Sequence, residues 1–140
     1  RAWTDDAGRF ERDVPADVNV VLGDSIGELL AYFAAADIAF VGGSLEPLGG
    51  HNLIEPIAMG TPTLVGPHTF NFAEATTQAV EAGAALRIAD AQALILQVRA
   101  LLQDPAKRAE LRAAALAFRA AHRGAVDRLA AWLAVRLPRA

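Results

Sequence analysis

Residues 42–56, GGSLEPLGGHNLIEP, combine residue types whose spacing suits ligand binding. The paired glycines, Gly42-Gly43 and Gly49-Gly50, let backbone N–H groups approach an anion closely, because glycine has no Cβ and adopts positive φ angles without strain. A helix is expected to follow, and the positive end of a helix favours a phosphate. The segment therefore predicts a phosphate cradle.

The carboxylate of Glu55 is a second candidate ligand group. One turn into the expected helix, it could accept hydrogen bonds from a ribose diol, as an acidic residue does in dinucleotide-binding folds. The spacing Asn52-x-x-Glu55 is also typical of a capping box, in which the pair only closes a helix N-terminus. The paired glycines could likewise serve only tight turns. The residues alone leave both interpretations open.

Other kinds of site do not fit the pattern. The segment lacks the lysine of a P-loop and the spacing of GxGxxG. Ser25 and Ser44 have no histidine tied to them by spacing, and Gly23-Asp24-Ser25 is not the GxSxG elbow of a hydrolase. The chain has no cysteine, and its three histidines show no metal-ligand spacing, so neither a metal nor a cofactor is expected.

Alternating strands and helices must position this segment. Short apolar runs predict strands at VNVVLG (18–23), IAFVGG (38–43), TPTLVGP (61–67) and ALRI (85–88). Helical spacing predicts a helix between each pair of strands. This alternation indicates βαβ units with right-handed crossovers. The predicted fold class is α/β, a Rossmann-like parallel sheet flanked by helices, with a helical C-terminal tail.

Glycines mark the expected helix ends. Helices are predicted at 27–37, at NLIEPIAMG closing at Gly60, and at NFAEATTQAV with a C-cap at Gly83. With 140 residues, 54% of them hydrophobic, the chain can bury one core. We expect a single domain with an irregular lead-in (1–17), a βα core (18–88) and a helical tail (90–137). Because it opens with Arg1 and a polar stretch, we expect a piece of a longer protein.

Three polar loops are expected at one edge of the sheet. Ligands of open parallel sheets bind beyond the carboxyl ends of the strands. Segments 24–28, 42–56 and 66–72 all follow predicted strands and carry glycine. Within the third loop, His68 alone is more typical of a surface residue, and Phe70 and Phe72 are more typical of a core. Three such loops at one edge of the sheet favour a ligand-binding site there.

Charge divides the chain in two. Residues 1–70 carry 3 Lys and Arg against 10 Asp and Glu, whereas residues 71–140 carry 10 against 6. The basic half suits phosphate or an anionic membrane surface. Long arginine side chains on solvated helix faces produce the same count, and we favour that interpretation. No apolar run approaches the roughly 20 residues of a membrane span, and no signal peptide is expected.

Residues 23–72 resemble the donor-binding region of the 3-deoxy-D-manno-octulosonic acid (Kdo) transferases, Gram-negative enzymes that move Kdo from CMP-Kdo to the lipid A precursor. The motifs GGSL-P-GGHN--EP and GPH--NF carry the resemblance. It implies a GT-B architecture of two Rossmann-like domains, with this chain similar to the later part of the C-terminal one. It also implies an inverting, metal-independent transfer whose general base, a carboxylate of the N-terminal domain, is absent from this sequence.

By position, the resemblance implies roles for ten residues. The CMP phosphate would be surrounded by Gly43, Ser44, Gly49, Gly50, His51 and Asn52; the ribose would be held by Glu55; the cytosine side would be lined by Ser25, Ile26 and Gly27. No catalytic residue is expected in this chain, which would be inactive alone. The acceptor, a lipid A precursor, would bind through the N-terminal domain. The whole enzyme would work at the cytoplasmic face of the inner membrane, and this piece would be soluble.

Two alternatives remain at this stage. One is the donor-binding domain of another GT-B enzyme, such as a UDP-sugar transferase or epimerase, which nucleotide preference would distinguish. The other is a non-catalytic nucleotide- or protein-binding module. Nucleic acid is not an expected partner. A sheet interrupted within its domain would expose a strand edge, so we expect a dimer through that edge or an N-terminal segment that covers it.

Overall fold

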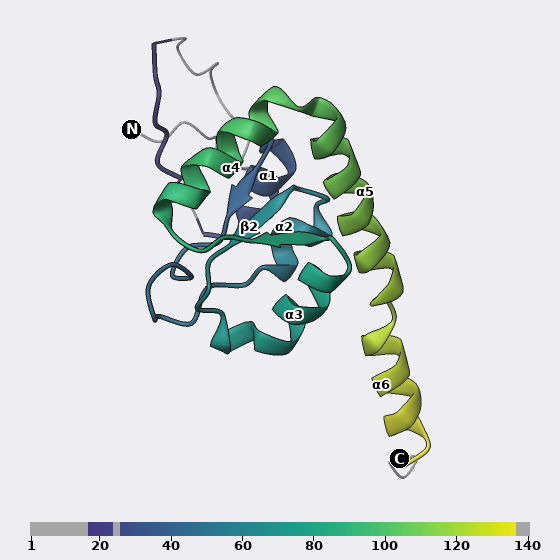
Figure 1. Ribbon diagram of the computed structural model, residues 1–140. Coiled ribbons are helices and arrows are strands. Elements are labelled where there is room, and N and C mark those ends of the chain that lie inside the picture. Colours follow the sequence, from purple (N-terminus) through teal and green to yellow (C-terminus); the bar gives the residue numbers. More distant parts are fainter. Residues whose placement is uncertain (1–16, 24–25, 137–140) are drawn as a thin grey trace.

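The computed structural model describes residues 17–23 and 26–136 and shows a parallel sheet with helices packed on it (Figure 1). The strands β1 (Ala39–Phe40), β2 (Thr63–Val65) and β3 (Ala85–Arg87) lie in the order β1-β2-β3. Both pairings are parallel. The predicted α/β class is therefore confirmed, although β1 is shorter than its apolar run because a turn begins at Gly42.

Helices precede each strand and continue beyond the sheet. The helices α1 (Leu29–Ala35), α2 (Ile54–Ala58) and α3 (Ala73–Glu81) precede β1, β2 and β3, and a short 3-10 turn, η1 (Phe70–Phe72), leads into α3. The tail contains α4 (Ala91–Gln103), α5 (Pro105–Ala121) and α6 (Ala125–Ala134). The helices that the periodicity predicted are thus present, as is the helical C-terminal region.

The central strand β2 divides the core into two layers, because successive side chains of a strand point to opposite faces. Leu64 packs with Leu111 in one layer, and Val65 packs with Ile57 and Ala115 in the other. Helix α5 contributes to both layers. Every residue of β2 is buried, which explains why this strand has no polar–apolar alternation.

Two helices end at the glycines that the sequence predicted. Gly60 and Gly83 have φ angles of +73° and +69°, in the left-handed region. The Gly83 N–H donates to the Val80 carbonyl (3.0 Å), and the Ala84 N–H donates to the Ala79 carbonyl (2.8 Å). These two bonds form a Schellman motif, which satisfies the last carbonyls of α3. The chain is thereby turned directly into β3.

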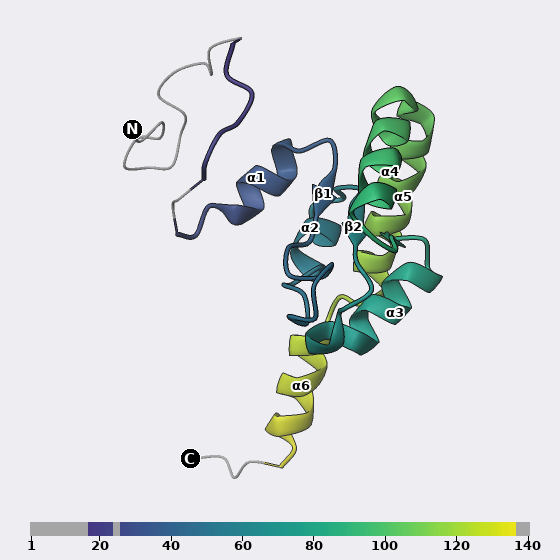
Figure 2. The ribbon, with the colours of Figure 1, turned by 60° about the vertical axis from the view of Figure 1, so that its left-hand side comes forward.

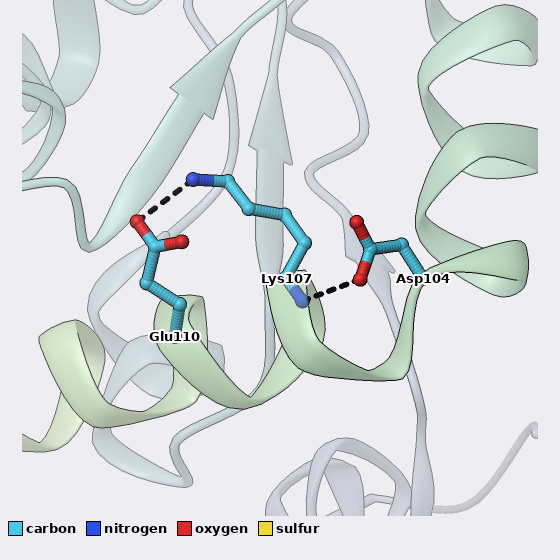
Figure 3. A network of polar contacts seen from close by, with 3 residues as sticks. All are labelled: Asp104, Lys107 and Glu110. Carbon is cyan, nitrogen blue, oxygen red and sulfur yellow. Dashed lines mark hydrogen bonds and ion pairs between the residues drawn. The ribbon is translucent and has the colours of Figure 1, made fainter.

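The junction of α4 and α5 is stabilised by a local polar network (Figure 3). An Asp104 carboxylate oxygen accepts a hydrogen bond from the Lys107 backbone N–H (2.8 Å) and caps α5, which begins with Pro105. The Lys107 ammonium lies 2.7 Å from a Glu110 carboxylate oxygen. Such a cap contributes about 1 kcal/mol, whereas an exposed ion pair contributes less. The network therefore stabilises the start of α5.

The predicted strand at 18–23 is wrong. Residues 17–23 have no regular secondary structure, and Val20 and Leu22 are 85% and 81% exposed. Figure 2 shows this segment lying apart from the sheet. A β-branched run becomes a strand only where a neighbouring strand and a covering layer bury it, and the described sheet ends at β1. Loop 24–28 consequently does not follow a strand.

Helix α6 projects beyond the rest of the fold in both views (Figures 1 and 2). It follows Gly124, whose φ angle is +83°. Leu129 and Trp132 are 57% and 52% exposed, and the Arg136 guanidinium stacks 4.1 Å from the Trp132 ring centroid. Across residues 17–23 and 26–136, none of the helices has the length and apolar character required to cross a membrane.

Candidate functional site

The loop between β1 and α2 is closed at its base by two backbone hydrogen bonds. The Gly50 N–H donates to the Gly43 carbonyl (2.9 Å), and the His51 N–H donates to the Gly42 carbonyl (3.1 Å). Gly43, Gly49 and Gly50 have φ angles of +69°, +92° and +71°, which L side chains rarely adopt. The glycines are therefore required by the turn geometry itself. We call residues 42–52 the glycine loop.

Ser44 joins the glycine loop to the end of β2. Its side chain is fully buried; the hydroxyl donates to the Val41 carbonyl (2.5 Å) and accepts from the Gly66 N–H (2.9 Å). The Ser44 carbonyl also accepts a hydrogen bond from the His68 N–H (2.9 Å). Because the hydroxyl is buried and bonded inside the protein, Ser44 positions the loop instead of presenting its side chain to a ligand.

Asn71 fixes the second glycine pair. Its side-chain amide donates to the carbonyls of Leu48 (3.3 Å) and Gly50 (3.4 Å), and its backbone N–H donates to the Gly49 carbonyl (3.1 Å). A Cβ on Gly49 would lie 2.6 Å from Asn71 Cγ. Asn71 was not among the residues predicted for the site, although its place in the GPH--NF motif was a signal that could have found it. The loop after β2 therefore supports the glycine loop along its length.

A pocket of about 470 Å³ lies beside the glycine loop. One wall is apolar and comes from α1 and β1, and the other is polar and comes from the glycine loop and the first turn of α2. This volume lies in the range of small-molecule sites. The lining residues are Leu29, Phe33, Phe40, Val41, Gly42, His51, Asn52 and Glu55.

Asn52 and Glu55 form a bonded pair on the polar wall. The Asn52 amide donates to Glu55 Oε1 (3.1 Å), and Asn52 Oδ1 accepts from the Ile54 N–H (3.0 Å). Helix α2 begins at Ile54 with Leu53 as its N-cap residue, so the pair does not form the capping box that its spacing allowed. Glu55 Oε2 has no hydrogen-bond partner within the described residues. That oxygen remains available to a ligand hydroxyl.

The structure brings together most of the residues that the sequence proposed. Gly43, Ser44, Gly49, Gly50, His51, Asn52 and Glu55 lie on the glycine loop and the helix that it enters. By contrast, the Ile26 side chain is fully exposed and Gly27 is exposed, and neither lines the pocket. Ser25 lies outside the described residues. In the described part of the chain, no three His, Asp or Glu side chains are placed to hold a metal ion.

Sequence comparison identifies the class of protein that this fold and site define. Residues 11–118 match the family described as Glycosyl transferases group 1. The match covers most of the chain, including the sheet, the glycine loop and most of α5. The chain belongs to this glycosyltransferase family.

Individual relatives show to which glycosyltransferases the chain is similar. The chain is 52% identical over 120 residues to a 3-deoxy-D-manno-octulosonic acid transferase from Bordetella pertussis, covering 83% of this chain and 28% of that protein. It is 43% identical over 123 residues to the enzyme of the same description from Haemophilus influenzae, covering 86% and 29%. The chain thus spans under a third of the length of either relative.

A solved structure agrees with these relatives. The crystal structure of the C-terminal CMP-Kdo binding domain of WaaA from Acinetobacter baumannii matches with a TM-score of 0.65 and 40% identity, over 69% of this chain and 50% of that one. The predicted resemblance to the C-terminal part of a Kdo transferase is confirmed, and so is the predicted GT-B type of parallel sheet. The chain is part of a transferase.

Proposed function

We propose that this chain is the part of a Kdo transferase that binds the donor, CMP-Kdo, at the carboxyl edge of its sheet. The observation that carries the proposal is the pocket in which the Asn52–Glu55 pair faces an apolar wall beside the glycine loop. A nucleoside needs an apolar surface for its base and hydrogen-bond acceptors for its ribose hydroxyls. Phe33 and Phe40 supply the first, and Glu55 Oε2 supplies the second.

The glycine loop would hold the phosphate of the donor. The backbone N–H group of Gly43, a half-buried residue, has no hydrogen-bond partner within the described residues. Backbone N–H groups of glycine-rich turns bind anions in this way. Under this proposal Gly49 and Gly50 shape the loop, and His51 and Asn52 border the pocket between phosphate and ribose. In the longer protein, we propose, the cytosine side of the donor is lined by Ser25, Ile26 and Gly27.

The chemical step would be completed outside this chain. We infer from the resemblance that transfer is inverting and metal-independent. A carboxylate of the N-terminal domain would remove the proton of the acceptor hydroxyl, whose oxygen bonds to the Kdo anomeric carbon while the bond to CMP breaks. The lipid A precursor would bind to that same domain, at the cytoplasmic face of the inner membrane. The part described here would hold the donor and the departing CMP.

Glu55→Ala tests the donor site. For the unsubstituted chain we expect NMR titration to show preference for CMP over UDP. The substitution should weaken CMP binding about ten- to 150-fold, because a hydrogen bond to a charged group contributes about 1.5–3 kcal/mol. Glu46→Ala is the matched control, since Glu46 is an exposed carboxylate of the same loop that does not line the pocket.

Each other outcome of this titration contradicts a different part of the proposal. Preference for UDP would contradict the Kdo assignment and favour another GT-B enzyme. If Glu55→Ala and Glu46→Ala changed the CMP affinity equally, Glu55 would not be a ligand of CMP. Absence of CMP binding to the unsubstituted chain would contradict a donor site in this part alone, and the same titration on the full-length relative would show whether additional chain completes it.

A second copy of the chain is a further partner that we propose. The N–H groups of Ala39 and Val41 donate to the carbonyls of Pro62 and Leu64. The Phe40 N–H therefore faces the open side of β1, which ends the described sheet. Open edges of this kind recruit another strand. We expect a concentration-dependent dimer in light scattering. A monomer that persists at the highest concentration would contradict pairing through this edge.

A further inference from the structure

Arg87 is the single lysine or arginine in a long acidic part of the chain. Between Asp13 and Val98 the sequence contains no lysine and no other arginine. Arg87 ends β3 in register with Val65, the last residue of β2, and therefore lies at the carboxyl edge of the sheet. No carboxylate of the described residues lies within ion-pair distance of it. An uncompensated positive charge thus stands at the same edge as the glycine loop.

The hydrogen bonds of Arg87 all run from one nitrogen of its guanidinium. Nη1 donates to the carbonyls of Gly66 (3.2 Å) and Pro67 (3.3 Å) and to the Thr69 hydroxyl (3.3 Å). A guanidinium carries five N–H donors on three nitrogens. Nε and Nη2 of Arg87 have no partner within the described residues, so the side chain retains free donors as well as its charge.

The turn that Arg87 contacts is the one that supports the glycine loop. The Gly66 N–H donates to the Ser44 hydroxyl, and a Cβ on Gly50 would lie 3.7 Å from Thr69 Cα. Arg87 is therefore separated from the glycine loop by the thickness of this turn. The ionisable groups of the glycine loop and of α2 add no fixed positive charge, since they are His51, Glu46 and Glu55.

We propose that Arg87 is the specificity residue for the negative charge of the donor, an inference that rests on the proposed function above. CMP-Kdo carries two oxyanions, the phosphate and the sugar carboxylate, and an edge with only carboxylates would repel both. A guanidinium pairs with either group through parallel N–H donors. Arg87 compensates the oxyanion charge and, through Nη1, holds the 66–69 turn in place.

The test compares charged and neutral ligands on Arg87→Gln and Arg87→Lys. Cytidine, CMP and freshly prepared CMP-Kdo are titrated by NMR into the chain. Arg87→Gln should weaken CMP binding at least about tenfold, the effect of losing a charge-assisted hydrogen bond, and leave cytidine binding unchanged. Arg87→Lys should restore part of the affinity. Arg99→Gln, which removes an exposed arginine of α4, is the matched control.

The ligand pattern separates a charge effect from a structural one. Equal weakening of cytidine and CMP would overturn the proposal, since Arg87 would then act only by supporting the turn. Unchanged binding of both CMP and CMP-Kdo would also overturn it while leaving the donor site intact. Weakening confined to CMP-Kdo would support it and assign the carboxylate as the recognised oxyanion. Failure of the unsubstituted chain to bind CMP would overturn the donor site proposed for this part alone, and this inference with it.

Discussion

Gly66→Ala is expected to lower the free energy of unfolding by about 3 kcal/mol or more. A Cβ at Gly66 would overlap the carbonyl carbon and oxygen of Ser44 and lie 2.7 Å from the Leu45 nitrogen. These are backbone atoms, which cannot move aside as a flexible side chain can. The turn and the glycine loop would have to separate, and the buried hydrogen bond between Gly66 and Ser44 would be lost. Overpacking and an unsatisfied buried donor each cost about 1–3 kcal/mol.

Gly42→Ala is the matched control for that experiment. A Cβ at Gly42 would make an ordinary contact, 3.5 Å from a His51 ring carbon, and Gly42 does not have a positive φ angle. We expect a change of under about 1 kcal/mol. Urea unfolding followed by circular dichroism measures both variants. Similar losses of stability in the two variants would show that the close approach of the turn and the loop is not required.

Leu64→Ala is expected to lower the free energy of unfolding by about 2–5 kcal/mol. Leu64 is fully buried on the central strand and packs with Leu101 of α4 and Leu111 of α5. The substitution would leave a cavity where the sheet meets both helices, and close packing prevents its complete collapse. Such a loss is a large part of the roughly 5–15 kcal/mol that stabilises a domain. The same urea titration measures it.

Leu96→Ala removes the same atoms from an exposed position of α4. Leu96 is 57% exposed, and alanine favours helix at least as well as leucine does, so the expected change is within about 0.5 kcal/mol. The contrast between the two leucines tests the core assignment directly. If Leu64→Ala were as mild as Leu96→Ala, α4 and α5 would not cover this face of the sheet in solution.

Local signals were the predictable part of the fold. Gly60 and Gly83 end α2 and α3 as expected, because a left-handed C-cap involves only residues within one turn of the glycine. The strand at Thr63–Val65 was predictable as well, since a central strand buried on both faces leaves an uninterrupted apolar run. Alternation of such strands with helices sufficed for the parallel α/β class.

The sequence did not predict which segments pair or pack with one another over long distances along the chain. The run at 18–23 has the composition of a strand, but a strand forms only with a partner, and none of the described strands pairs with it. For helix α1 the sequence likewise predicted the element but not its packing. Its periodicity predicted the helix, yet Leu29 and Leu30 remain 50% and 48% exposed, because periodicity does not say what lies against the apolar face.

The features of the binding site also separate into those that depend on neighbouring residues and those that depend on distant contacts. By itself the sequence determined the loop, its glycines and the presence of Asn52 and Glu55 at the start of a helix, because these features depend on neighbouring residues. Only the tertiary structure decided that Ser44 is buried beneath Gly66 and that Arg87 reaches the turn after β2, contacts that join residues 22 and 21 positions apart. Burial and hydrogen bonding between distant segments exist only once the strands have paired. For that reason the resemblance could place Ser44 beside the ligand without showing that its hydroxyl is buried, and the sequence assigned Arg87 no role.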